Sequence, residues 1–113
     1  MILYYYPKCS TCMKAKRFLE EQGHLPELVD LMKETPSAEE LKSLHQKSGL
    51  DLKRFFNTSG QLYRSMAIKD RYDSMTDEER YELLASDGYL IKRPILLKGD
   101  RVYVGFREKE WEQ

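Results

Sequence analysis

The chain has 113 residues, 41% of them hydrophobic, and its 19 Lys plus Arg are balanced by 19 Asp plus Glu, giving a formal net charge of zero. This balance argues against binding of nucleic acid or anionic membranes through bulk positive charge, although two local basic pairs, Lys53-Arg54 and Lys92-Arg93, remain. No apolar run approaches the roughly 20 residues of a membrane span, and no basic region precedes the apolar N-terminus as in a signal peptide, so we expect one cytoplasmic domain spanning residues 1–113.

The first part of the chain predicts a strand, a helix and a second strand. Residues 2–6 are apolar and aromatic, which is typical of a buried strand, and Pro7 ends it. An apolar stripe at helical spacing predicts a helix over residues 10–22. Residues 25–31 are the expected second strand, so this part indicates a β-α-β unit.

The middle of the chain predicts helices only. Two capping-box patterns, Ser37 with Glu40 and Thr76 with Glu79, start helices that end at Gly49 and at about Ser86. Two further helices are expected over residues 51–56 and 61–72, the second with Leu62, Met66 and Ile68 facing inward.

The last part of the chain predicts a β-hairpin. Strands over 94–97 and 102–104 flank a turn, and a short helix is expected over 107–112. A β-α-β unit followed by a hairpin indicates a mixed sheet covered by helices. The order predicts an α/β, thioredoxin-like fold with a mixed four-stranded sheet and an all-helical insertion. Its core halves are residues 1–32 and 89–113, and the insertion covers roughly 33–88.

A cysteine pair, Cys9 and Cys12, lies between the first predicted strand and the first predicted helix. Residues three apart share a helix face, so the two thiols are able to close a small disulfide ring. Cys9 falls at the helix N-terminus, where the dipole, the free N–H groups and the neighbouring Lys8 favour a thiolate. The spacing and its place in the fold favour a redox-active pair.

Two other interpretations of the cysteines stay open. Both residues would be inert if they were simply buried in the core. A zinc site would need two more ligands, and the only histidines, His24 and His45, stand at no recognised spacing, so we expect no metal. Both histidines are predicted to lie on exposed helix positions without a role.

Several motifs together resemble the arsenate reductase/Spx family. They are Pro7-Lys8-Cys9-Ser10-Thr11-Cys12, Phe56-Asn57-Thr58-Ser59-Gly60, Arg93-Pro94-Ile95 and Val104-Gly105-Phe106. The resemblance covers nearly the whole chain and is strongest to an arsenate reductase-like branch with a Cys-x-x-Cys. It implies a thioredoxin-like fold with a helical insertion and Cys9 as the nucleophile. In thioredoxin folds a cis-proline packs beside the active cysteine, and Pro94 is the candidate; an ordinary trans proline is the alternative.

The resemblance to arsenate reductases is incomplete at the anion site. Those enzymes hold arsenate with three arginines, and only Arg93 matches one of them. Asn57 and Gly105 stand at the other two positions, with Arg54 and Arg107 close by in the sequence. We therefore expect weak arsenate reduction.

The resemblance to Spx regulators rests on the Cys-x-x-Cys and on the segment Lys92-Arg93-Pro94-Ile95. It implies a redox-sensing transcriptional regulator that binds the C-terminal domain of the RNA polymerase α-subunit. The segment 49–53 does not match the binding region cleanly, and the chain ends at Gln113 before the longer tail of those proteins. The regulator is the second candidate, and a genuine arsenate reductase is the third.

The first candidate is a thiol–disulfide oxidoreductase. Cys9 attacks the substrate and Cys12 resolves the intermediate. Ser10, Thr11 and the first helix amides hold negative charge, and Arg93 orients an anionic substrate or a glutathione carboxylate. We expect a monomer without a bound cofactor, with glutathione as a co-substrate and glutaredoxin or thioredoxin as reductant, and with neither nucleic acid nor membrane as partner.

Overall fold

The computed structural model describes residues 1–112 and contains a four-stranded sheet in the order β2-β1-β3-β4. Strand β1 (Ile2–Tyr5) pairs in parallel with β2 (Glu27–Asp30) and antiparallel with β3 (Ile95–Lys98), which pairs antiparallel with β4 (Arg101–Val104). The predicted mixed sheet is thus confirmed, although β2 is shorter than the predicted strand over 25–31.

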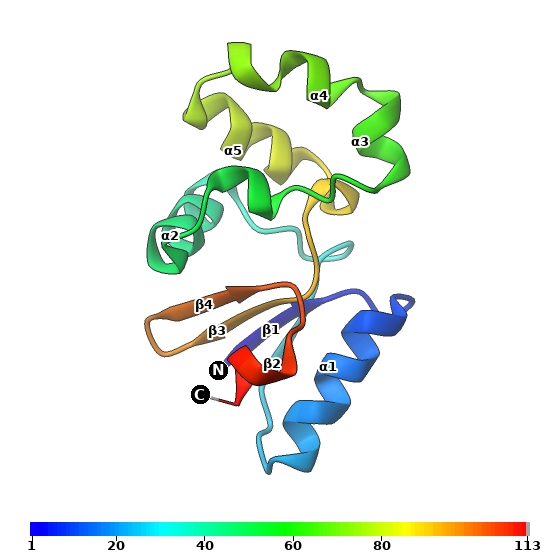
Figure 1. The fold of residues 1–113 in the computed structure, drawn as a ribbon, viewed down its shortest axis with the longest axis vertical. Helices are drawn as coiled ribbons and strands as arrows, with labels where there is room; N and C mark the ends of the chain where they lie inside the picture. Colours follow the sequence, from blue (N-terminus) through cyan, green and yellow to red (C-terminus); the bar gives the residue numbers. More distant parts are fainter. Residues whose placement is uncertain (113) are drawn as a thin grey trace.

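Helices cover both faces of the sheet (Figure 1). Helix α1 (Ser10–Glu21) links β1 to β2, and the short α6 (Glu108–Trp111) packs on the same face. The segment between β2 and β3 is helical and lies on the other side of the sheet (Figure 1). Its elements are α2 (Ala38–Ser48), η1 (Leu52–Phe55), α3 (Gln61–Ser65), α4 (Ile68–Arg71), η2 (Tyr72–Ser74), α5 (Asp77–Ser86) and η3 (Gly88–Leu90).

The pleat of β1 divides the core into two clusters. Leu3 is buried against a cluster on the α1 side that includes Leu19 and Trp111. Tyr4, the next residue, points to the opposite face and joins the larger cluster under the helical segment. Because successive side chains of a strand point to opposite faces, one apolar strand anchors both layers.

The two predicted capping boxes have different outcomes. At α5 both bonds are present, since Thr76 Oγ1 accepts from the Glu79 N–H at 3.1 Å and Glu79 Oε1 accepts from the Thr76 N–H at 2.9 Å. At α2 only one of the two bonds is present, in which the Ser37 hydroxyl accepts the Glu40 N–H. The Glu40 carboxylate instead accepts a hydrogen bond from the Tyr4 hydroxyl at 2.8 Å. The expected reciprocal box at Ser37 is wrong because Tyr4 takes up the carboxylate.

The single helix predicted over 61–72 is wrong. The segment breaks at Ala67, which adopts a left-handed conformation with φ of 52°, and a 3-10 turn follows α4. Of the residues expected inward, Ile68 is fully buried, whereas Leu62 and Met66 are half-buried. The break brings the rings of Tyr63 and Tyr72 onto Phe56, with ring centroids 6.2 and 5.4 Å from that of Phe56. Burial of these aromatic rings stabilises the fold more than an unbroken helix would.

Two residues have structural roles that the sequence did not indicate. His45 is half-buried, and its ring nitrogens lie 2.6 Å from the Tyr81 hydroxyl and 2.9 Å from the Leu50 carbonyl, so the predicted free surface position is wrong. Gly88 is buried so closely against β2's end that an added Cβ would lie 2.3 Å from the Leu31 carbonyl oxygen. Within residues 1–112, no helix has the length and apolarity needed to cross a membrane.

Candidate functional site

Cys9 immediately precedes α1 and is its N-cap residue. The Cys9 N–H donates to the Tyr6 carbonyl at 3.0 Å, which closes the turn between β1 and the helix. The Cys9 Sγ accepts the backbone N–H of Cys12 at 3.4 Å, in the place where a cap oxygen usually accepts. Cys9 therefore lies at the helix N-terminus, as the sequence predicted.

The two thiols have opposite pKa shifts. Partial burial acts to raise the pKa of Cys9, but hydrogen bonding by Cys12 and the neighbouring Arg93 guanidinium outweigh it, so the pKa lies below its ordinary value. Cys12 is fully buried, and burial, with a contribution from Cys9, raises its pKa to about 12. Cys9 is thus the sulfur poised to ionise, and the cation that assists it is Arg93, whereas the sequence indicated Lys8.

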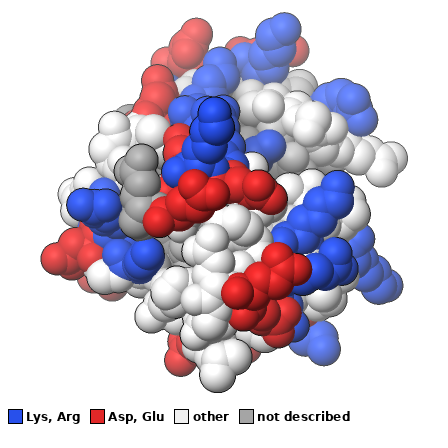
Figure 2. All heavy atoms as spheres, turned by 60° about the horizontal axis from the view of Figure 1, so that its bottom comes forward, with Lys and Arg blue, Asp and Glu red and all other residues white. Residues whose placement is uncertain are grey.

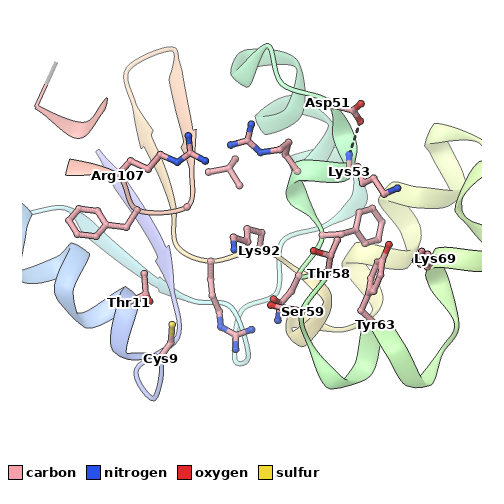
Figure 3. A pocket seen from close by; sticks show the side chains of 17 residues that line it. Cys9, Thr11, Asp51, Lys53, Thr58, Ser59, Tyr63, Lys69, Lys92 and Arg107 are labelled. Carbon is pink, nitrogen blue, oxygen red and sulfur yellow. Dashed lines mark hydrogen bonds between the residues drawn. The ribbon is translucent and has the colours of Figure 1, made fainter. Parts of the chain in front are cut away.

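The Cys9 side chain opens into a pocket of about 940 Å³. Figure 3 shows Cys9 and Thr11 on one side of the pocket, Lys92 near its middle, and Thr58, Tyr63 and Lys69 on the other side, from the helical segment. The lining also includes Asp51, Lys53, Arg54, Phe56, Asn57, Ser59, Arg93, Val104, Gly105, Phe106 and Arg107. The pocket therefore lies between the thioredoxin-like core and the helical segment.

Backbone hydrogen bonds hold the two walls of this pocket together. An isolated bridge pairs Phe56 with Ile91, just before the Arg93–Pro94 peptide. The Asn57 N–H donates to the Leu90 carbonyl and the Lys92 N–H donates to the Phe55 carbonyl, both at 2.8 Å. These bonds fix the positions of the two basic pairs, which are far apart in the sequence.

Positive charge dominates the pocket lining. The cationic residues are Lys53, Arg54, Lys69, Lys92, Arg93 and Arg107, against the single carboxylate of Asp51, which caps the Lys53 N–H at 3.0 Å (Figure 3). Within residues 1–112, the three ion pairs of the structure involve none of these cations. On the face that Figure 2 shows, basic and acidic side chains lie beside one another among uncharged surface. The zero net charge therefore conceals a strongly polarised site.

Arg93 links the charge to the cysteine. The Arg93–Pro94 peptide bond is cis, and Pro94 is buried at the start of β3. The Arg93 guanidinium carbon lies 5.4 Å from the ring centroid of Tyr6, and Tyr6 in turn contacts Tyr89 through hydroxyls 3.1 Å apart. One guanidinium nitrogen, Nη1, is buried without a hydrogen-bond partner among the described residues. The Arg93 guanidinium also helps to lower the pKa of the Cys9 thiol, so the Cys9 thiolate is an anion within its reach.

The predicted site residues do not all reach the pocket. Cys9, Thr11 and Arg93 line it, whereas Cys12 is buried behind Cys9 and Ser10 is exposed outside the lining. The helix amide that contacts the Cys9 sulfur is that of Cys12.

Residues of the helical segment were not predicted as site residues. Lys69, Tyr63, Thr58 and Ser59 all line the pocket. The sequence signals for this wall were the basic pair Lys53-Arg54 and the family motif Phe56-Asn57-Thr58-Ser59-Gly60, and neither indicated Tyr63 or Lys69.

The two departures from the arsenate reductase pattern also fall in the pocket. Asn57 and Gly105 line it, and so do their neighbours Arg54 and Arg107. Gly105 has a φ of +81°, a conformation that strains any other residue. The Trp111 indole N–H donates to the Gly105 carbonyl at 3.2 Å, which ties this turn to α6. No cluster of three or more His, Cys, Asp or Glu suited to a metal occurs in the described part of the chain.

A mixed four-stranded sheet, a cysteine at the N-cap of its first helix and a cis-proline before β3 define a thioredoxin-like thiol protein. The chain belongs to the ArsC family, whose profile matches residues 4–113.

Comparison with curated relatives and solved structures agrees with this assignment. The chain is 51% identical over its full length to the uncharacterized protein YusI of Bacillus subtilis, covering 96% of that protein. It is 29% identical to an arsenate reductase of Haemophilus influenzae, over 93% of the chain and 90% of the relative. It is 26% identical to the global transcriptional regulator Spx of Lactiplantibacillus plantarum, over 97% of the chain and 82% of the regulator.

Solved structures show the same fold. An ArsC family-related protein from Bacteroides fragilis superimposes with a TM-score of 0.94 and 41% identity, covering 98% of this chain and 93% of the other. An arsenate reductase from Vibrio cholerae gives a TM-score of 0.88 and 28% identity, covering 96% and 92%. Both the thioredoxin-like fold and the family resemblance predicted from the sequence are thus confirmed.

Proposed function

We propose that the protein is a thiol–disulfide oxidoreductase in which Cys9 is the nucleophile and Cys12 the resolving thiol. The observation that carries this proposal is the Cys9 thiol itself, which caps α1, has a lowered pKa and opens into a cationic pocket. A thiolate in such surroundings is a nucleophile without a separate general base.

The reaction has two exchange steps. The Cys9 thiolate attacks one sulfur of a substrate disulfide, forms a mixed disulfide and expels the other sulfur as a thiolate, which takes a proton from water. Cys12 then loses its proton and attacks the Cys9 sulfur, which breaks the mixed disulfide and releases the second substrate thiolate. Two electrons pass from the cysteine pair to the substrate, and the pair is left as a disulfide.

The pKa of Cys12 sets the order of these steps. Burial is the main cause of its raised value, and the adjacent Cys9 adds to it. Once Cys9 is held in a mixed disulfide, its negative charge is gone and that contribution disappears. Cys12 therefore becomes easier to ionise only after the substrate is bound covalently.

The remaining roles follow from the pocket. Arg93 binds an anionic group of the substrate, such as a glutathione carboxylate, and Thr11 lies beside Cys9 on the same side of the pocket (Figure 3). Glutathione with glutaredoxin, or thioredoxin, would return the disulfide to the dithiol without a bound cofactor. Such a cycle suits a monomer in the reducing cytoplasm.

A comparison of substrates tests the proposal. Purified wild type, Cys9→Ser and Cys12→Ser are assayed with a glutathione mixed disulfide in a single turnover without other thiols, and separately with arsenate, where glutaredoxin and glutathione are supplied. We expect wild type to reduce the mixed disulfide, Cys9→Ser to be inactive and Cys12→Ser to accumulate a covalent adduct visible by mass spectrometry. Full activity of Cys9→Ser would exclude the proposed nucleophile.

Arsenate reduction is the third candidate function. It is favoured by one observation, that Arg54 and Arg107 line the same pocket as Arg93 and so supply cations that Asn57 and Gly105 lack. In that case the arsenate arm of the assay, rather than the disulfide arm, would show turnover.

A redox-sensing regulator is the second candidate, and the relative named as the regulator Spx favours it. This function requires binding to the C-terminal domain of the RNA polymerase α-subunit. A pull-down with that domain, using the reduced and the oxidised protein, tests it. We expect no binding, and capture at micromolar affinity would place the regulator first.

A further inference from the structure

The cationic pocket has two ends, and only one of them is explained by the chemistry at Cys9. In Figure 3, Cys9 and Thr11 lie on one side, while Lys53, Tyr63 and Lys69 lie on the opposite side. These three residues come from the helical segment, in η1, α3 and α4, and all line the pocket. We name Lys53, Thr58, Ser59, Tyr63 and Lys69 the distal wall.

The size of the pocket indicates a ligand much larger than a tetrahedral oxyanion. A volume of about 940 Å³ lies near the upper end of the range for small-molecule sites, about 300–1,000 Å³. An oxyanion bound at Cys9 and Arg93 would leave the distal wall without a ligand. An elongated molecule would reach both ends.

The charge of the pocket indicates the chemistry of that ligand. Six cations face one carboxylate, and the Asp51 carboxylate already accepts the Lys53 N–H. Like charges around one cavity repel each other, so a ligand with several negative charges relieves the repulsion. Glutathione carries two carboxylates and an ammonium group and offsets little of this excess, whereas phosphate groups offset more.

The donors of the distal wall suit phosphate. Lys53 Nζ lies 5.2 Å from the ring centroid of Tyr72, a contact that holds a lysine by its cation–π attraction and leaves it able to donate hydrogen bonds. Hydroxyl groups of Thr58, Ser59 and Tyr63 line the same wall. A lysine ammonium group attracts phosphate as a compact point charge, and hydroxyl groups add hydrogen bonds to the phosphate oxygens. Neither group needs the planar geometry of an arginine–carboxylate pair.

We propose that the substrate is the disulfide of a small thiol that carries phosphate at the end remote from its sulfur. The sulfur meets Cys9, and the phosphate is bound by Lys53 and Lys69 of the distal wall. This proposal rests on the proposed oxidoreductase function and names its substrate class. The chemical steps are the two exchanges given above, with an external thiol as reductant.

Matched disulfides test the role of phosphate. Coenzyme A disulfide carries phosphates remote from its sulfurs, and pantethine has the same thiol arm without them; glutathione disulfide supplies carboxylates instead. We expect kcat/KM for coenzyme A disulfide to exceed that for pantethine by about tenfold or more, as one or two charged hydrogen-bonding groups would give. A ratio near one, or a preference for glutathione disulfide over coenzyme A disulfide, would overturn the proposal.

Variants locate the effect. In the double variant Lys53→Gln, Lys69→Gln, we expect the ratio of kcat/KM for coenzyme A disulfide over pantethine to fall by about tenfold. Lys33→Gln is the control, since Lys33 is exposed and does not line the pocket, and it should keep the wild-type ratio. An unchanged ratio in the double variant, with its thermal unfolding midpoint near that of wild type, would remove Lys53 and Lys69 from the site.

A binding measurement separates this proposal from the proposed function. Calorimetry with Cys9→Ser compares reduced coenzyme A with pantetheine, with and without the two lysine substitutions. If wild type exchanges none of the disulfides but coenzyme A binds more tightly through Lys53 and Lys69, the phosphate site stands and the oxidoreductase function fails. If exchange proceeds and coenzyme A binds no better than pantetheine, the phosphate site alone is wrong.

Discussion

The backbone N–H of Cys12 donates to the Cys9 Sγ across 3.4 Å. Through this bond, an N–H of the first turn of α1 contacts the Cys9 sulfur at the N-cap. The positive charge of Arg93 also acts on the Cys9 sulfur. Cys12 itself is buried and has a raised pKa. One short segment thus gives two thiols with opposite tendencies to ionise, which is the condition for separate attacking and resolving roles.

The first prediction concerns alkylation. We expect limiting iodoacetamide at pH 7 to modify Cys9 faster than Cys12 by about tenfold or more, because only a thiolate reacts and Cys12 is both buried and protonated. Since the pKa of Cys9 is lowered, its alkylation rate should reach its plateau at a lower pH than that of an ordinary thiol, and it should fall as the pH drops through the folded-state pKa. Peptide mapping by mass spectrometry measures both; preferential labelling of Cys12 would reverse the assigned roles.

The second prediction concerns oxidation. Because Cys12 follows Cys9 by one helical turn, mild oxidation should give an intramolecular disulfide in the monomer, and dithiothreitol should reverse it. Non-reducing electrophoresis with mass spectrometry distinguishes this product from a covalent dimer. Cys12→Ser is the control, since it leaves Cys9 only intermolecular partners. Dimers as the sole product of wild type would contradict the resolving role of Cys12.

The third prediction concerns Arg93. Its guanidinium helps to lower the pKa of Cys9, so Arg93→Gln should move the pH profile of Cys9 alkylation to higher pH. The same variant should lower kcat/KM for an anionic disulfide by about 10- to 100-fold, since a charge-assisted hydrogen bond is lost. Arg17→Gln, at an exposed position of α1, is the control. A wild-type pH profile in Arg93→Gln would separate Arg93 from the thiolate.

The sheet and its first helix were predictable because local pattern and burial agree there. The apolar runs over residues 2–6 and 94–97 predict buried strands. The pairing of β1 with β3 then follows from the topology. The break at Ala67 was not predictable, because Tyr63 and Tyr72 turn toward Phe56 only once the other layer is present. Tertiary packing there outweighs local helical preference.

Local spacing made only the cysteines of the candidate site predictable, while the family resemblance also indicated Arg93, Asn57 and Gly105. Cys9 and Cys12 identify themselves by spacing and by following a strand. The distal wall depends on hydrogen bonds such as that from the Lys92 N–H to the Phe55 carbonyl, which no single segment reveals. The pairs Lys53-Arg54 and Lys92-Arg93 were visible in the sequence, but their meeting in one pocket is a property of the fold.

The fourth prediction concerns Gly105, which has a φ of +81°. An added Cβ would meet only Lys92 Cε, at an ordinary distance of 3.7 Å, so the cost of Gly105→Ala is backbone strain of about 1–2 kcal/mol. Gly23→Ala is the matched control, since Gly23 has the same φ with no neighbour within 4 Å of an added Cβ. Urea unfolding should show similar losses of stability for both. A much larger loss at Gly105 would show that packing at the pocket, rather than strain, decides the cost.

The fifth prediction concerns arsenate. By the family resemblance, Arg93 is retained, whereas Asn57 and Gly105 are neutral at the other two arginine positions. Each charge-assisted hydrogen bond contributes about 1.5–3 kcal/mol, so losing one or two weakens oxyanion binding by about 10- to 10⁴-fold. We therefore expect arsenate turnover by wild type, measured with glutaredoxin and glutathione, to be weak compared with turnover of a mixed disulfide.

Substitutions at the anion site decide whether neighbouring arginines fill the gap. Asn57→Arg restores a charge within the pocket and should raise arsenate turnover, whereas Gly105→Arg also strains a residue with positive φ and is a poorer restoration. Arg54→Gln and Arg107→Gln should change arsenate turnover little, because we do not expect either residue to hold the oxyanion. Efficient wild-type turnover that both substitutions abolish would contradict this: Arg54 and Arg107 would then replace the two missing arginines, and arsenate reduction would become the first candidate function.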